Sequence, residues 1–366
     1  MKKFILPSLF LSILLIITKS FSQNELKLNF NSYVDTYIAT DNDKSSKTFD
    51  TNGVHNNRKY SYNDNLKNEF ALNLAMITAN VEYKNFARLK ITLQAGNLPE
   101  KAYSGFGPNI QEAYIGINII EGLWLDAGYF LTHIGGEVYF PKDNFLTSHS
   151  MVTYFEPFYH EGVRLMYENG PFTAGFHLCN GNGIFQDNND NKSFGLSFGY
   201  NMGSMLAVSY SGIYGNEEPA PNPAKNHLLH NICLNSTPIE KLNLKAQFDL
   251  GQKDDIVHDS ANNKMKSGSF TGISLQGKYQ LIKKFSLAAR YSNFNNEDRV
   301  EGFGGTDIVK GSELAFGVEY KPIEKSYIRF EMRMLNLDDK YKYFLDKDSK
   351  PTNSRLEFMI NFGVLF

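Results

Sequence analysis

The sequence predicts an all-β protein, a transmembrane antiparallel up-and-down β-barrel of about 16 strands. Three observations support this prediction: many segments alternate between apolar and polar residues, the connections between them alternate between short and long, and aromatic residues flank the short connections. Alternation with a period of two is typical of a strand with one apolar and one polar face. A soluble sandwich with Greek-key crossings has no reason to sort its loops by length.

The predicted strands have about the length that crosses a bilayer, which takes about 9–11 tilted residues. In the segment 240–251, leucine, alanine and phenylalanine occupy one face, whereas lysine, asparagine, glutamine and aspartate occupy the other. Strands are expected near 25–39, 68–83, 86–97, 109–119, 123–133, 160–168, 172–180, 193–201, 204–215, 227–236, 240–251, 269–280, 284–294, 311–321, 326–337 and 353–366.

The connections between these strands fall into two classes that alternate along the chain. The short ones are EYKN, IIEG, ENGP, NMGS, STPIEK, QLIKK and KPIEKS, and the long, polar ones cover 40–67, 98–108, 134–159, 181–192, 216–226, 252–268, 295–310 and 338–352. In an antiparallel meander, this alternation puts every long loop at the same end, as in outer-membrane barrels with short periplasmic turns.

Aromatic residues flank the short connections in pairs, as in a girdle at a membrane–water boundary. The alternative is the ordinary preference of aromatic residues for strands, which would scatter them along each segment. The pairs are Tyr83 and Phe86, Tyr167 and Phe172, Tyr279 and Phe285, and Tyr320 and Tyr327, with Phe366 expected at the same level.

The chain ends in RLEFMINFGVLF, a strand with one bulky apolar face. An unpaired edge strand of this kind is a template for aggregation. In lipid every backbone N–H and C=O must be paired inside the protein, so a sheet can span a membrane only when it closes on itself. We therefore expect this strand to pair with the first one, in which Leu26, Leu28 and Phe30 face outward.

The first residues and the composition place the protein in the cell envelope. Residues 1–22 combine lysines, a short apolar core and small residues, which predicts a cleaved signal peptide, with a retained anchor as the alternative. The barrel is then expected over 23–366, in the outer membrane of a Gram-negative bacterium. A net charge of −2 argues against a nucleic-acid partner. Cys179 and Cys233 are too few to hold the fold together by disulfides and are expected to be free thiols.

The segment from Gly128 to Gly170 resembles the signature region of the OmpL-like β-barrel porins. In that family a G-x-F strand precedes an IGxE turn, an Asn, a Ser-x-Ser, a Pro and a Gly-x-x-x-x-Tyr strand. The matching positions are Gly128 and Phe130, Ile134 to Glu137, Asn144, Ser148 and Ser150, Pro157, Gly162 and Tyr167. The resemblance implies an outer-membrane barrel and a porin, and the terminal Phe366 is similar to the signal that the barrel insertion machinery reads.

Charged residues on the polar faces would line a pore and set its ion preference. The inward faces carry a small excess of basic residues, which favours a weak anion preference. A cluster around Arg333 suggests either a constriction or opposite charges that brace the wall by pairing across strands. The expected pore-lining residues are Lys90, Arg164, Lys245, Arg290, Arg329, Glu331, Arg333, Arg355 and Glu357.

The long connection 134–159 is expected to fold into the lumen and narrow it. Gly135, Gly136 and Pro141 permit sharp turns, and the loop's aromatic residues need burial. The alternative is a loop packed over the mouth of the barrel. The expected constriction residues are Glu137, Tyr139, Asn144, Ser148, Ser150 and Tyr154.

These patterns favour a porin-like channel for passive diffusion of small hydrophilic solutes or ions. The alternatives are a closed structural or adhesive barrel with partner-binding loops and a substrate-specific outer-membrane transporter. The histidines near the 134–159 loop fit no tight metal-ligand spacing, and no G-x-S-x-G motif indicates a hydrolase. No metal, cofactor or catalytic residue is predicted. The expected partners are outer-membrane lipid, the insertion machinery, small hydrophilic solutes and other copies of the chain in a homo-oligomer.

Overall fold

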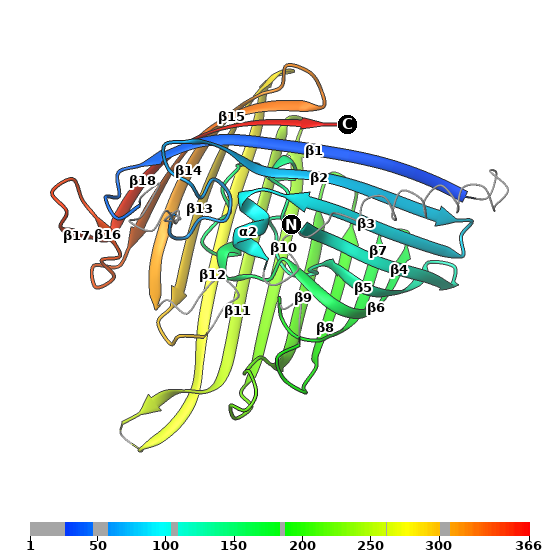
Figure 1. The fold of residues 1–366 in the computed structure, drawn as a ribbon, viewed down its shortest axis with the longest axis horizontal. Coiled ribbons are helices and arrows are strands. Elements are labelled where there is room, and N and C mark those ends of the chain that lie inside the picture. The colour runs from blue at the N-terminus through cyan, green and yellow to red at the C-terminus, as the bar shows by residue number, and fades with distance from the viewer. Residues whose placement is uncertain (1–25, 47–57, 104–108, 184–186, 261, 301–307) are drawn as a thin grey trace, which may run out of the picture.

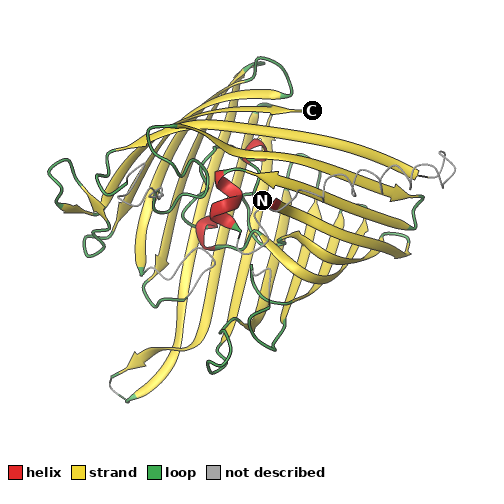
Figure 2. Cartoon of the chain, viewed as in Figure 1, coloured by secondary structure: helices red, strands yellow, loops and turns green. Residues whose placement is uncertain are grey.

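The computed structural model describes residues 26–46, 58–103, 109–183, 187–260, 262–300 and 308–366 of the 366-residue chain. The predicted signal peptide, residues 1–22, lies outside these ranges. Within them, sixteen long strands form one closed antiparallel barrel (Figures 1 and 2). This confirms the predicted fold class.

Each long strand pairs with its neighbours along the chain, and the last one closes the ring on the first. Two short strands, β16 (Phe344–Leu345) and β17 (Pro351–Thr352), form a separate hairpin between β15 and β18. The barrel strands are β1 (Leu26–Asp41), β2 (Phe70–Tyr83), β3 (Ala87–Ala95), β4 (Ile110–Ile120), β5 (Leu123–Leu131), β6 (Tyr159–Asn169), β7 (Phe172–Cys179), β8 (Ser193–Asn201), β9 (Ala207–Asn216), β10 (Asn226–Ile239), β11 (Leu242–Asp259), β12 (Lys264–Ile282), β13 (Phe285–Asn296), β14 (Val309–Tyr320), β15 (Ser326–Leu337) and β18 (Ser354–Leu365).

The seam of the barrel is the β1–β18 pair, as the sequence predicts. The register runs from Tyr33 opposite Leu365 to Asp41 opposite Glu357. At the end of the seam, the backbone groups of Ser32 and Phe366 bond each other in both directions at 2.9 Å. The terminal strand therefore exposes no unpaired edge along this register.

The two faces of the wall differ as the alternation predicts. On β13, the outward side chains of Leu287 and Tyr291 are exposed, whereas the inward side chains of Arg290 and Ser292 are buried. Large apolar side chains are exposed around the outside of the barrel, which would be unfavourable in water and fits the hydrocarbon of a membrane. A one-residue slip of any strand would exchange its two faces, so the register is strongly specified.

Three features depart from the predicted elements. The strands β11 and β12 extend as a hairpin well beyond their predicted ends at 251 and 269, and this hairpin projects from the barrel in Figure 1. Its polar sequence lacks the apolar alternation that a membrane-embedded strand needs. A short helix, α2 (Asn97–Ala102), and two 3₁₀ turns in the 134–159 connection were also not predicted. None of the helices in the described part of the chain combines the length and the apolarity that crossing a bilayer requires.

The aromatic residues beside the short turns are mostly outward, as predicted for a girdle. Phe86, Phe172 and Phe285 are among the exposed residues. Tyr327 is an exception, because only 3% of its surface is exposed and its hydroxyl donates a 2.6 Å hydrogen bond to Asp35 Oδ2. The prediction for Tyr327 was wrong because its position on β15 has the same parity as the inward Arg329.

Candidate functional site in the barrel lumen

The lumen contains the connection between β5 and β6, residues 132–158, which we call the lumen loop. A hydrogen bond from Thr132 N to Phe158 O closes its base at 3.0 Å. From there the loop crosses the barrel, because Gly135 N bonds Asn231 Oδ1 of β10 at 3.2 Å and Gly136 N bonds Gln247 Oε1 of β11 at 3.0 Å. The loop therefore lies inside the barrel and is not packed over its mouth.

Glu137 attaches the lumen loop to the wall. Its Oε1 lies 2.9 Å from Arg290 Nη1 of β13 and accepts a 3.0 Å hydrogen bond from Gln276 Nε2 of β12. The backbone N–H of Ser150 donates to the other oxygen at 2.7 Å. Burial raises the pKa of Glu137, but Arg290 and His149 outweigh it and hold that pKa at about 2. The side chain is therefore a buried anion that Arg290 balances.

A second attachment joins the middle of the lumen loop to β15. Both the backbone N–H and the hydroxyl of Ser148 donate to the carboxylate of Glu331, and Thr147 N donates to it at 2.7 Å. Arg290 also reaches this part of the loop, with a 2.6 Å hydrogen bond to Ser148 O. Arg329 donates to the carbonyl of Pro141. Three inward side chains of the wall thus bond backbone atoms of the loop.

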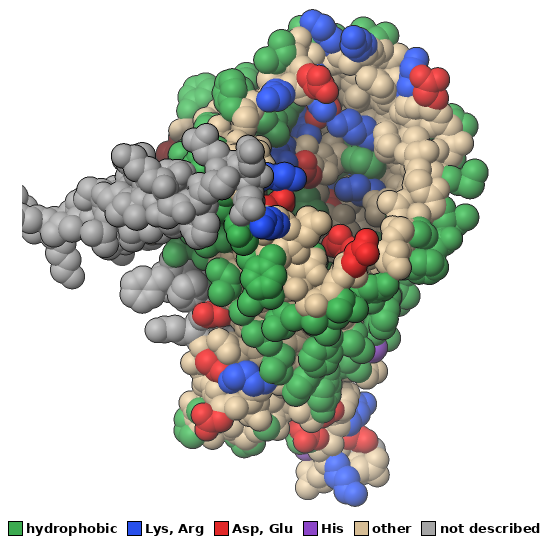
Figure 3. All heavy atoms as spheres, turned by 90° about the vertical axis from the view of Figure 1, so that its right-hand side faces the viewer, with side chains coloured by type: hydrophobic (Ala, Val, Ile, Leu, Met, Phe, Trp, Pro, Cys, Tyr) green, Lys and Arg blue, Asp and Glu red, His purple; other side chains and the backbone are tan. Residues whose placement is uncertain are grey.

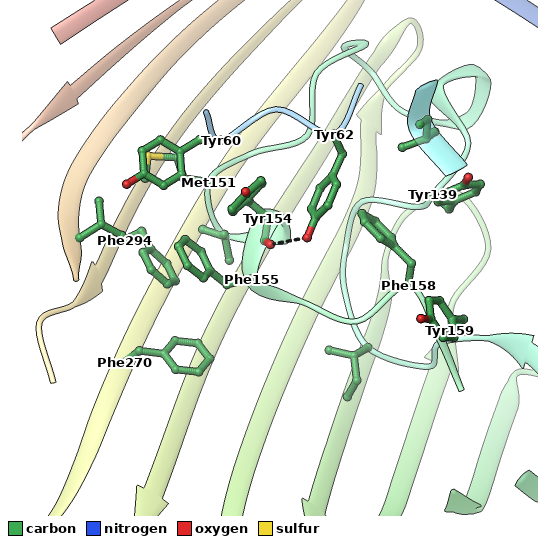
Figure 4. Packing of buried hydrophobic residues seen from close by; sticks show 14 of the residues in the cluster. Tyr60, Tyr62, Tyr139, Met151, Tyr154, Phe155, Phe158, Tyr159, Phe270 and Phe294 are labelled. Carbon is green, nitrogen blue, oxygen red and sulfur yellow. Dashed lines mark hydrogen bonds between the residues drawn. The ribbon is translucent and has the colours of Figure 1, made fainter. Parts of the chain in front are cut away.

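Aromatic side chains of the lumen loop pack in the interior with those of a second inserted segment, residues 58–67 (Figure 4). The rings of Tyr62 and Phe158 meet edge to face at 5.0 Å, and Tyr62 donates a 3.3 Å hydrogen bond to Tyr154 O. Phe155 stacks on Phe294 of β13 at 4.2 Å. Such pairs add to the free energy gained by burying apolar area. The loop is thus held by an apolar core inside the barrel as well as by polar contacts.

A chain of ion pairs, which we call the charge ladder, runs across the inner wall and through both inserted segments. The lumen loop contributes Glu137, whereas segment 58–67 contributes Arg58 and Lys67. The remaining members lie on β1, β13, β14, β15 and β18. Successive N···O distances are Glu137–Arg290 2.9 Å, Arg290–Glu313 2.7 Å, Glu313–Arg333 2.5 Å, Arg333–Glu357 3.7 Å, Glu357–Arg58 2.7 Å, Arg58–Asp41 2.9 Å and Asp41–Lys67 2.8 Å.

A buried carboxyl pair lies at the far end of the lumen loop. Glu156 Oε1 accepts hydrogen bonds from Gln247 Nε2 at 2.7 Å and from Asn231 Nδ2 at 3.3 Å. The same two amides donate to Asp249 of β11, at 3.2 and 2.6 Å. Burial, and then the neighbouring Asp249, raise the pKa of Glu156 well above its ordinary value.

All nine predicted pore-lining residues lie on strands and point inward, but they do not share one environment. Lys90 pairs with Glu112, Arg164 pairs with Asp126, and Lys245 lies 4.8 Å from the ring centre of Phe145. The lumen loop and segment 58–67 cover the rest, which are each at most 3% exposed. These are Arg290, Arg329, Glu331, Arg333, Arg355 and Glu357.

The six predicted constriction residues all lie in the lumen loop, where they mostly hold its shape. Asn144 bonds both the N–H and the carbonyl of Val138, at 2.9 and 2.7 Å, and Tyr139 donates to Gln94 Oε1 of β3 at 2.9 Å. Ser148, Ser150 and Glu137 make the contacts described above, and Tyr154 belongs to the aromatic core. Sequence reasoning missed segment 58–67, and its alternation of Tyr60 and Tyr62 with polar residues is too short to predict burial.

A cavity of about 430 Å³ remains between the lumen loop and β11–β14, at the end of the barrel where the short turns lie. Figure 3 shows a hollow at one end of the molecule, with lysine and arginine side chains around and inside it and acidic side chains beside them. Cys179 and Cys233 are both buried free thiols. Among the described residues, no three histidine, cysteine or carboxylate side chains are arranged to hold a metal ion.

A closed sixteen-stranded barrel with an apolar outer face, a charged inner face and an inserted loop defines the class of porin-like outer-membrane barrels. The chain belongs to the family described as "Putative beta-barrel porin-2, OmpL-like", whose model matches residues 27–366. This membership confirms the resemblance and places the protein in the Gram-negative outer membrane. No curated protein matches the chain significantly.

Solved porin structures share the fold at low sequence identity. The trimer form of OmpT, an outer membrane protein of Vibrio cholerae, superposes with a TM-score of 0.63 at 14% identity, covering 93% of this chain and 100% of its own. The anion-selective porin from Comamonas acidovorans gives 0.60 at 11% identity, with 93% and 100% coverage. The channel DcaP of Acinetobacter baumannii gives 0.58 at 10% identity, with 93% and 98% coverage.

Proposed function

We propose that this protein is a passive channel through the outer membrane for small hydrophilic solutes or ions, and that the lumen loop narrows it. The observation that carries the proposal is a loop bound to the inner wall by Glu137 and Ser148 while a polar cavity stays open beside it. Barrels of sixteen or more strands are wide enough to leave an aqueous channel. Flux through such a channel follows the concentration gradient.

In this proposal the lumen residues divide into two roles. The constriction residues Glu137, Asn144 and Ser148 hold the loop in place, and the covered arginines of the charge ladder fix the loop to the wall. The less buried pore-lining residues Lys90 and Lys245 would face solutes directly. The cluster of opposite charges around Arg333 was expected either to form a constriction or to stabilise the wall. In this proposal it does both, because its ion pairs fix the loop that narrows the channel.

The test is single-channel conductance of the mature protein in planar bilayers, with a series of neutral solutes of increasing size. Deleting residues 138–155 removes the loop without removing any strand, so the barrel wall keeps its hydrogen bonds. We expect higher conductance and a larger size cut-off. A matched control shortens the projecting β11–β12 hairpin beyond Lys253 and Gly268, which should leave both values unchanged. Unchanged conductance in the loop deletion would refute the constriction.

A second candidate is a closed barrel whose external loops bind partners. The burial of Arg333, Arg355 and Glu357 beneath inserted segments favours it, because much of the lumen is filled. Wild-type protein that gives no conductance steps at any voltage would support this candidate. A substrate-specific transporter is the third, and its flux would saturate with one solute.

We also propose that the protein contacts outer-membrane lipid through its apolar belt, is inserted through a signal in the strand that ends at Phe366, and assembles as a homo-oligomer. One of the similar structures is titled as a trimer, which supports the last point by analogy. Chemical cross-linking in native membranes tests it, and a pattern with only the monomer would contradict it.

A further inference from the structure

We propose that the mouth at the short turns binds small, multiply charged oxyanions of the phosphate class, and that this site makes the channel prefer anions. The inference deepens the proposed function, since the preference needs a conducting pore, whereas the binding does not. Short turns face the periplasm in outer-membrane barrels, so the site opens on that side.

The site is the 430 Å³ cavity between the lumen loop and the wall, which we call the basic vestibule. Five lysines line it: Lys142, Lys278, Lys283, Lys284 and Lys321. They come from four places in the chain, namely the lumen loop, β12, the turn between β12 and β13, and the residue after β14. The hollow in Figure 3 lies at an end of the barrel and has both basic and acidic side chains around it. Convergence of separate segments distinguishes this site from a run of charged residues along one turn.

The charges in the vestibule do not cancel. Its two lining carboxylates are already paired, Asp143 with Lys142 at 2.5 Å and Glu319 with Lys278 at 2.6 Å. Arg329, just beneath, also pairs with Glu319 at 2.7 Å. Lys283 and Lys284 have no carboxylate within ion-pair distance in the part of the chain that the structure describes. The cavity therefore keeps a net positive charge that an entering anion can neutralise.

The uncharged polar groups at the vestibule also suit an anion. Asn243 uses its Oδ1 to accept a 2.9 Å hydrogen bond from Thr237, which leaves its amide N–H groups as donors. The hydroxyl of Ser286 borders the same cavity. Ammonium, amide and hydroxyl donors together match an oxyanion, which accepts hydrogen bonds at every oxygen. A cation would meet donors and excess positive charge instead.

The opposite wall of the lumen provides the contrast. There Lys90 pairs with Glu112, and both Arg88 and Arg164 pair with Asp126, at 2.7 and 2.9 Å. This group of charges is nearly balanced, so it offers an entering ion little net attraction. Of these two groups, the vestibule has the larger positive excess, with five lysines and two carboxylates.

The size of the vestibule indicates weak, hydrated binding. A volume of 430 Å³ is much larger than a phosphate ion, since one water occupies about 30 Å³ of liquid, so the anion keeps part of its water. Conduction needs a site that attracts an ion but also releases it. A roomy lysine-lined site meets both needs, whereas a tight arginine clamp would retain the ion.

The experiment compares three proteins. The first is wild type, and the second is the vestibule variant, which carries both Lys283→Gln and Lys284→Gln. The third is a control that carries both Lys27→Gln and Lys84→Gln, two lysines at the same end of the barrel but outside the vestibule. The first readout is the chloride-to-potassium permeability ratio in a KCl gradient at low salt. The second is the concentration of inorganic phosphate that halves the chloride current. In wild type and control we expect a preference for chloride over potassium and block by phosphate. In the vestibule variant we expect a permeability ratio near one. Its phosphate block should be about tenfold weaker, which corresponds to roughly 1.4 kcal/mol of binding free energy.

Phosphate binding is also measured without conduction, by ³¹P line broadening on the detergent-solubilised protein. Broadening in wild type and control that is lost in the vestibule variant supports the site. Equal broadening in all three proteins overturns it, and so does a conducting wild type without anion preference. Absence of any conductance would refute the proposed channel but not the site, which the broadening then decides alone.

Discussion

The middle of the lumen and the basic vestibule both contain charged side chains, but those in the middle are buried in ion pairs, whereas two lysines of the vestibule are exposed and unpaired in the described structure. In the charge ladder, Arg333 and Glu313 are fully buried and lie 2.5 Å apart. In the vestibule, Lys283 and Lys284 are exposed and have no ion-pair partner in the described structure. Burial without a partner is costly for a charge, whereas exposure lets water replace the partner. The ladder can therefore hold a loop, and the vestibule can attract a mobile ion.

This difference shows that inward-facing charge alone does not indicate a pore-lining role. Buried ion pairs gain little net stability over apolar packing, but removing one partner leaves a buried charge alone. The ladder thus makes the position of the lumen loop specific, because a displaced loop would separate Glu137 from Arg290, which keeps Glu313 as its other partner. In the vestibule the lysines stay exposed to water when an ion leaves, so no buried charge loses its partner. Substitutions in each region would test this contrast.

The largest effect is expected for Arg290→Met, which leaves Glu137 buried without a cation. We expect a loss of about 3–5 kcal/mol, as is typical when one partner of a buried ion pair is removed. The free energy of unfolding is measured by heat or denaturant in detergent. The matched vestibule change is Lys321→Met, whose Nζ lies 3.8 Å from Glu319 at an exposed position and should cost less than about 1 kcal/mol. Equal losses in the two variants would mean that the ladder does not anchor the loop.

The buried thiol of Cys233 reports directly on the loop in these variants. A Cβ placed on Gly136 would lie 3.1 Å from Cys233 Sγ, so the loop covers this cysteine. In a Cys179→Ser background, a water-soluble thiol reagent should react slowly with wild type and faster with Arg290→Met. Adding Glu137→Gln to Arg290→Met removes the stranded charge and should recover part of the protection.

A smaller effect is expected where the loop packs on the wall. Gly317 of β14 faces Leu146, and a Cβ there would lie 2.5 Å from Leu146 Cδ2. Gly317→Val should push the loop away at a cost of about 1–3 kcal/mol and expose Cys233. Gly277 is the matched control, because a Cβ there would meet only Leu244 Cδ2 at an ordinary 3.5 Å. If Gly277→Val speeds thiol labelling as much as Gly317→Val, strain in the wall rather than the loop contact is responsible.

Much of the fold could be predicted from the sequence because it depends on local alternation. Alternation within β13 is enough to show that Leu287 points outward and Arg290 inward. Closure of the barrel follows because the backbone of β18 must be paired in the membrane. Tyr327 lies two residues before the inward Arg329 on β15, so the same alternation places it inward. The β11–β12 hairpin was missed because outside the membrane nothing requires apolar alternation.

The site could be predicted only in part, because its partners are distant in sequence. Inward charge was evident at Arg333, but its cover comes from segment 58–67, whose Tyr60 carbonyl accepts a 3.0 Å hydrogen bond from Arg333 Nη1. No local pattern links those positions. Glu137 and Ser148 were found through the family motif, and their role as anchors became evident only from the register that brings Arg290 to both.

The contact between Glu156 and Asp249 should make the loop sensitive to pH. The pKa of Glu156 is raised, so its contribution to stability is complete below the unfolded value, about 4.3, and is lost as the pH rises through the raised value. Glu137 behaves in the opposite way: its pKa of about 2 is depressed, so its contribution is lost only as the pH falls below about 4.3.

We therefore expect Cys233 labelling of wild type, relative to Glu156→Gln, to increase as the pH is raised from about 5 to 9. The ratio of the two proteins at each pH removes the intrinsic rise in thiol reactivity. An increase of a few fold corresponds to about 1 kcal/mol. A ratio that stays constant over this range would show that the pair is not under electrostatic strain.

The smallest effect concerns salt, and it separates the two regions most directly. Screening shortens the reach of exposed charges from about 10 Å at 0.1 M to about 3 Å at 1 M salt, whereas buried pairs are screened much less. The anion preference caused by Lys283 and Lys284 should therefore decline steadily between these concentrations of KCl. Cys233 labelling, which depends on the buried pair of Glu137 and Arg290, should not change. If both readouts follow the salt concentration together, water reaches the ladder as freely as the vestibule, and the lumen is a single solvated region.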